Sequence, residues 1–99
     1  MKICFKCSEL TKASIILTYK MDWFQEELPE IIEHFFLQFP MLNKIERIQG
    51  ADLEVVRIKW QGHDYCLNFE CYGQSIWLES PEENSTALLA QLYQAMCDL

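Results

Sequence analysis

Two short glycine turns divide the second half of the chain into runs of alternating apolar and polar residues. Gln61-Gly62-His63-Asp64 and Tyr72-Gly73-Gln74-Ser75 each carry glycine at the first central position of a two-residue hairpin turn. Such turns predict an antiparallel meander of three strands with one strongly apolar face, because alternate side chains of a strand lie on opposite faces. The predicted core pairs are Trp60 with Tyr65, Ile58 with Leu67, Val56 with Phe69, Cys71 with Ile76 and Phe69 with Leu78.

The opposite, outer face of this predicted sheet also carries large apolar side chains. A strand at about 44–48 is expected to pair back through residues 49–52, with Ile45 on the core face and Ile48 on the outer face. Apolar side chains ringed by a few polar ones are typical of an interface core. The alternatives are that a helix of the same chain covers the face, or that the register is wrong. The predicted interaction surface consists of Ile48, Leu53, Val55, Tyr72 and Trp77.

The remaining elements follow from periodicity and from helix-start signals. Residues 2–7 and 13–19 alternate as strands, and residues 22–39 carry apolar side chains at helical spacing. Pro29 predicts either a kink in this helix or a main helix that starts near it. A second helix is expected after Ser80-Pro81-Glu82-Glu83, with a later start at Asn84-Ser85 left open.

These elements predict one α+β domain over residues 1–99, in the order β-β-α-β-β-β-β-α. We expect two layers, a mostly antiparallel sheet and both helices on its apolar face. The sequence does not indicate whether the strands at 2–7 and 13–19 join the same sheet, or in what order.

Charge and composition exclude several classes of partner. The formal net charge is −7, and the basic residues are scattered singly, whereas nucleic acids and anionic membranes require clustered basic surface. The N-terminus has no apolar signal-peptide region, and no apolar run is long enough to span a membrane. We therefore expect a cytoplasmic protein whose five cysteines are thiols.

No residue set predicts catalysis, a metal site or a cofactor. Cys4-Phe5-Lys6-Cys7 has C-x-x-C spacing, but residues three apart in a strand point to opposite faces, so packing is the plainer interpretation. The adjacent pair His63 and Asp64 would likewise diverge along a strand. Cross-strand ion pairs of Arg47 and Arg57 are the expected role for the nearby glutamates.

Residues 50–79 resemble a known family. Gly50-Ala51-Asp52, Trp60-Gln61-Gly62 and the run from Leu67 to Glu79 are similar to a small gammaproteobacterial family of unknown function. The resemblance implies the strands already predicted and a bacterial, cytoplasmic setting. It transfers no activity.

Two functional hypotheses follow. The first is a non-catalytic protein-interaction module that uses the outer sheet face to bind a partner protein or a second copy of itself. The second is a small-molecule binding protein or minor enzyme with an aromatic pocket between helix 22–39 and the sheet. Asp64 and Glu70 are the expected polar groups of that pocket.

Overall fold

The computed structural model describes residues 4–82 and 86–98 and shows an α+β fold. Two helices and one six-stranded antiparallel sheet follow the predicted order, with a short 3-10 turn before the first helix. The fold class and element order are therefore confirmed. The elements are β1 (Phe5–Leu10), β2 (Ser14–Tyr19), η1 (Gln25–Glu27), α1 (Leu28–Gln38), β3 (Asn43–Gln49), β4 (Leu53–Trp60), β5 (His63–Glu70), β6 (Ser75–Glu79) and α2 (Thr86–Cys97).

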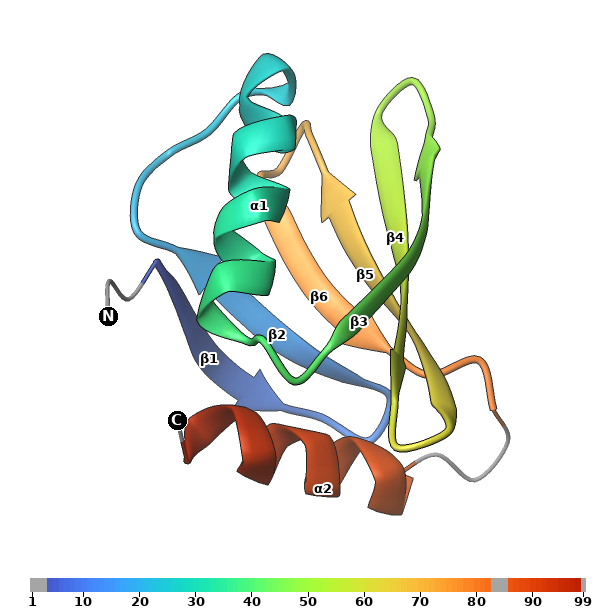
Figure 1. Ribbon diagram of the computed structural model, residues 1–99. Coiled ribbons are helices and arrows are strands. Elements are labelled where there is room, and N and C mark those ends of the chain that lie inside the picture. The colour runs from blue at the N-terminus through green and yellow to red at the C-terminus, as the bar shows by residue number, and fades with distance from the viewer. Residues whose placement is uncertain (1–3, 83–85, 99) are drawn as a thin grey trace.

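The first hairpin extends the meander into a single sheet. The strand order is β1-β2-β6-β5-β4-β3, so β2 pairs with β6 although more than fifty residues separate them. Figure 1 shows α1 lying across the front of this sheet and α2 across one end, beside β1 and β2. Both helices are therefore on the face predicted to be the core. No described helix is long and apolar enough to cross a membrane.

The end of α1 is tied to the first strand by one buried amide. Gln38 Oε1 accepts hydrogen bonds from the backbone amides of Cys4, at 2.9 Å, and Phe5, at 2.8 Å, and its Nε2 donates to the Phe5 carbonyl at 2.9 Å. The buried polar group is thereby satisfied. At its other end α1 begins at Leu28, so Pro29 lies in the first turn, where its missing N–H costs nothing.

The β4–β5 hairpin has the predicted faces but not the predicted register. Trp60 pairs with His63, Ile58 with Tyr65 and Val56 with Leu67, each two residues away from the expected partner. The turn is Gln61-Gly62, with positive φ at both residues, 50° and 81°. This is the backbone of a type I′ turn rather than one that begins at glycine. A shift of two residues keeps every side chain on its face, so the core assignment survives.

Gly62→Val is expected to lower the free energy of unfolding by about 1 kcal/mol or more, because a β-branched residue resists positive φ. A Cβ at Gly62 would meet nothing within 4 Å, so the cost comes from the backbone alone. Chemical denaturation measures it. Gly62→Asn is the matched control, since asparagine tolerates this conformation and should cost less. Equal losses for the two variants would contradict this account.

The β5–β6 turn corrects the position of Tyr72. Phe69 pairs with Ile76 and Leu67 with Leu78, again two residues away from the predicted pairs Cys71–Ile76 and Phe69–Leu78. The ladder ends at the pair Glu70–Ser75, and residues 71–74 form a longer turn than expected. The Glu70 carboxylate holds this turn by accepting hydrogen bonds from the amides of Tyr72, at 2.9 Å, and Gly73, at 2.8 Å. Tyr72 is 85% exposed at the end of the sheet and is not part of the outer face.

Strand β3 also differs from its prediction. A register shift between Lys44 and Glu46 places Arg47, rather than Ile45, opposite the core residue Val56, and Ile45 is exposed. The reason is a β-bulge, which adds one residue to one strand and exchanges the two faces beyond it. Lys44 and Arg47 therefore lie on the helix-covered side of the sheet.

Candidate functional site

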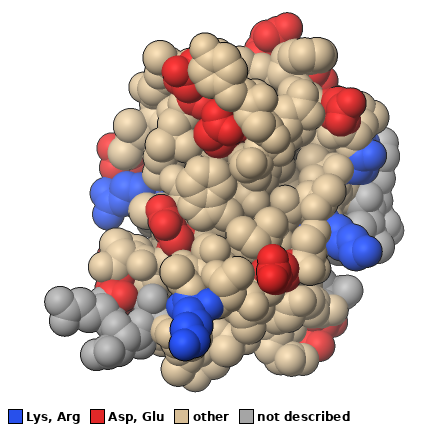
Figure 2. All heavy atoms as spheres, turned by 180° about the vertical axis from the view of Figure 1, so that it is seen from behind, with Lys and Arg blue, Asp and Glu red and all other residues tan. Residues whose placement is uncertain are grey.

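The outer face of the sheet has no described helix over it. Both helices lie on the opposite side in Figure 1. Figure 2 views the molecule from behind and shows uncharged surface over much of this face, with single acidic and basic side chains scattered over and around it. An apolar stretch with charged side chains around it on an open sheet is the arrangement expected of an interaction surface.

Four apolar side chains of this face, with Asn68 at their centre, form one row that crosses five strands. Ile16 pairs with Trp77, Trp77 with Asn68, Asn68 with Val55, and Val55 with Ile48, so these five residues lie directly opposite one another from β2 to β3. Trp77 and Val55 are half-buried and Ile48 is exposed. We call these five residues the transverse row.

The prediction and the structure share three members of this row, Ile48, Val55 and Trp77. Leu53 lies one row further along the same face, opposite Glu70. Ile16 was missed. The alternating pattern of β2 places Ile16 on the face opposite Ile15 and Leu17. No signal in the sequence, however, indicated that β2 pairs with β6.

A second row of the outer face carries charge. Glu46 pairs with Arg57, Arg57 with Cys66, and Cys66 with Glu79. Arg57 Nη1 donates to Glu46 Oε2 at 2.9 Å, which confirms the expected cross-strand ion pair. Glu79 has no ion-pair partner among the described residues. It accepts a hydrogen bond from Asn68 Nδ2 at 3.2 Å, which helps to satisfy an amide that is buried on this otherwise open face.

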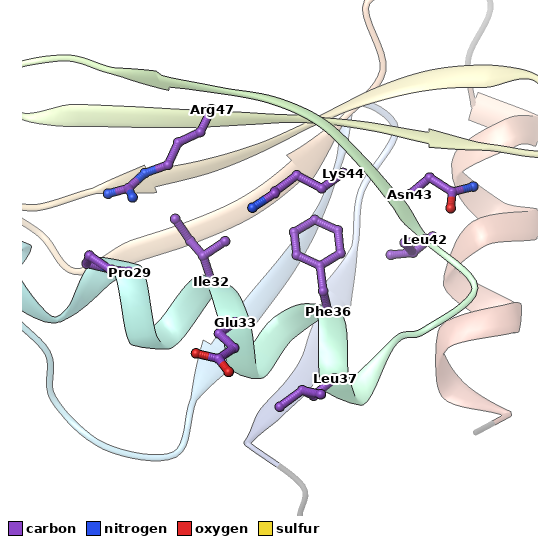
Figure 3. Close-up of a pocket in the computed structure, with 9 residues that line it drawn as sticks. All are labelled: Pro29, Ile32, Glu33, Phe36, Leu37, Leu42, Asn43, Lys44 and Arg47. Carbon is purple, nitrogen blue, oxygen red and sulfur yellow. The ribbon is translucent and has the colours of Figure 1, made fainter.

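A groove lies on the opposite side of the sheet, between α1 and β3. Its volume is about 530 Å³. Figure 3 shows Ile32 and Phe36 pointing from the helix toward β3, while Lys44 and Arg47 reach over them from the strand. The complete lining is Pro29, Ile32, Glu33, Phe36, Leu37, Leu42, Asn43, Lys44 and Arg47.

The predicted pocket polar groups do not line this groove. Asp64 pairs with Lys59 on β4 at an oxygen-to-nitrogen distance of 3.9 Å, and Glu70 caps the β5–β6 turn. Both belong to the outer-face side chains of β5, which point away from the helices. The groove instead takes its polar groups from β3, whose bulge turns Lys44 and Arg47 toward α1.

Comparison with known proteins identifies a family for this chain. Residues 5–94 match the family described as protein of unknown function, DUF3630. The chain belongs to the DUF3630 family. No curated protein and no solved structure matches it. The match confirms membership of an uncharacterised family over a longer stretch than the resemblance at residues 50–79.

Three cysteines of this DUF3630 domain differ from reactive thiols. Burial, together with the neighbouring Cys97, raises the pKa of the Cys7 thiol to about 12. Burial also raises the pKa of Cys66 and Cys71. A raised pKa keeps a thiol protonated, and the thiolate is the nucleophilic form. Within residues 4–82 and 86–98, no group of three or more metal-binding side chains lies together.

The two histidines are engaged in structural contacts. Tyr19 Oη lies 2.7 Å from His34 Nδ1, and His63 Nδ1 lies 3.1 Å from Glu82 Oε2. The second contact ties the β4–β5 hairpin to the segment before α2. Neither contact joins a histidine to a nucleophilic cysteine or serine.

Proposed function

We propose that this protein is a non-catalytic interaction module that pairs with a second copy of itself through the outer sheet face. The observation that carries the proposal is the symmetry of that face about β5. In the transverse row, Asn68 of β5 has two apolar residues on each side, Trp77 and Ile16 in one direction and Val55 and Ile48 in the other.

The charged row has the complementary symmetry that a twofold axis requires. Cys66 of β5 has Arg57 on one side and Glu79 on the other. When two sheets stack face to face about an axis along β5, β4 of each copy lies over β6 of the other. Arg57 of one copy then faces Glu79 of the second copy, and the contact occurs twice.

The same operation brings the apolar residues together. Val55 of one copy lies over Trp77 of the second, and Ile48 lies over Ile16. The apolar row is buried at the centre while the charged row forms part of its rim, as in stable protein interfaces. Arg57 and Glu79 fix the register and select against partners that lack the matching charges.

The cellular setting is part of the proposal. Five cysteines and a net charge of −7 suit a reducing, bacterial cytoplasm, where the thiols stay free. The two copies carry like net charge, so their association depends on local complementarity on the outer face rather than on long-range attraction.

A charge exchange tests the twofold arrangement. Arg57→Glu and Glu79→Arg should each weaken self-association by about tenfold or more, because each places like charges opposite one another twice. The double variant should restore it when Glu46→Gln is added, because this removes the repulsion between Glu46 and the new carboxylate at position 57. Analytical ultracentrifugation over a concentration series measures association, and a thermal melt of each variant confirms folding.

Lys59→Glu is the matched control for this exchange. It makes the same charge change on β4. Lys59 pairs with Asp64 of β5, but Asp64 has no partner on β6, because the pairing of β5 with β6 begins at Cys66. In the proposed dimer, therefore, no described strand residue of the second copy faces Lys59. It should have the smaller effect. A wild-type protein that stays monomeric would contradict self-pairing and favour a different protein partner. A double variant that stays weak with Glu46→Gln added would contradict the axis along β5.

A further inference from the structure

The groove between α1 and β3 combines an apolar floor with two cationic side chains. Ile32 and Phe36 form the floor, and Lys44 and Arg47 extend over it from β3 (Figure 3). The protein has only 8 Lys and Arg residues against 15 Asp and Glu. Two cations over one groove are therefore a local reversal of the overall charge.

A buried carboxylate holds one of these cations in place. Arg47 Nε donates to Glu54 Oε2, and Glu54 is only 2% exposed. A buried ion pair is a poor source of stability, since desolvation offsets much of the attraction. It does set the direction of the planar guanidinium. The terminal nitrogens of Arg47 remain as donors on the groove side, and Figure 3 shows them above Pro29 and Ile32.

Lys44 supplies a positive charge that no acidic side chain neutralises among the described residues. It has no ion pair among the described residues, whereas the charge of Arg47 is offset by Glu54. Glu33, the acidic member of the lining, points away from Lys44 (Figure 3). One uncompensated positive charge matches a monoanion better than a dianion, because a second negative charge would have no counterpart.

We propose that this groove binds a small organic monocarboxylate with an apolar body. The carboxylate lies between the Lys44 ammonium and the Arg47 guanidinium, which donate charge-assisted hydrogen bonds to its two oxygens. The apolar body lies on Ile32 and Phe36. Glu54 is a positioning residue, because it acts on the ligand only through Arg47. A groove of about 530 Å³ is within the size range of small-molecule sites.

The site is independent of the proposed self-association. It lies on the helix-covered side of the sheet, whereas the transverse row lies on the outer face. A ligand in the groove and a second copy on the outer face do not compete for any residue. Failure of one proposal therefore leaves the other standing.

Octanoate is the probe that tests the site. Amide chemical-shift changes in a two-dimensional NMR titration of the full chain should concentrate on α1 and β3 and should saturate. Acetate has the charge without the chain, and 1-octanol has the chain without the charge. Each should bind at least about tenfold more weakly than octanoate, since each lacks one of the two contributions.

Lys44→Gln should weaken octanoate binding by about tenfold, because it removes one charge-assisted hydrogen bond. Lys44 is exposed, so the variant should fold like the wild type. Lys12→Gln makes the same charge change at an exposed position outside the groove and should bind octanoate normally. Three results would each overturn the proposal: no saturable shifts on α1 and β3, equal binding of octanoate and 1-octanol, or unchanged binding by Lys44→Gln.

Discussion

Phe69→Ala is expected to lower the free energy of unfolding by about 3–5 kcal/mol, the largest loss among the variants considered. Phe69 is fully buried on the central strand β5, between Glu54 of β4 and Ile76 of β6. Its ring packs edge-on against Trp23 with the ring centroids 6.0 Å apart. Truncation removes this contact and leaves a cavity beside Trp23 in a close-packed core.

Urea denaturation followed by circular dichroism measures this loss. Tyr72→Ala is the control, because Tyr72 is the most exposed of the large apolar residues that the structure describes and should change stability by less than about 0.5 kcal/mol. Asn68 is not a suitable control for an outer-face residue, since it is itself buried and hydrogen-bonded. Similar losses for Phe69→Ala and Tyr72→Ala would show that the core is not where we place it.

Trp77→Ala is expected to weaken self-association by about 2 kcal/mol or more, which is roughly 30-fold in the dissociation constant. Trp77 lies next to the centre of the transverse row, on the face opposite its buried neighbours Ile76 and Leu78. Large aromatic side chains at the centre of an interface are its usual energetic anchors. Truncation should therefore affect binding far more than folding.

Sedimentation and a thermal melt together distinguish the two roles of Trp77. Tyr72→Ala, a second aromatic truncation outside the outer face, should leave association unchanged. If Trp77→Ala unfolds the monomer as readily as Phe69→Ala does, then Trp77 is a structural residue. If it changes neither stability nor association, the transverse row is not an interface, and the proposal of self-association through this face is contradicted.

The local pattern of residues was sufficient to predict the elements and the faces of β4, β5 and β6. Ile58, Leu67 and Phe69 are buried where alternation placed them, and α1 begins near Pro29, which was one of the two alternatives for this proline. The prediction of these faces succeeded although the registers of both hairpins were wrong by two residues. Side chains alternate with a period of two, so an error of two residues leaves every face unchanged.

The tertiary structure alone decided the register, the strand order and the composition of both candidate sites. Positive φ at Gln61 sets the hairpin register, and the pairing of β2 with β6 brings Ile16 to Trp77. Because of the bulge in β3, Arg47 rather than Ile45 lies on the helix-covered face, and the groove there is cationic. Alternation is a local property that each strand carries in its own residues. Bulges and strand partners instead depend on contacts between segments far apart in the chain, and these form only when the sheet and its helices pack together.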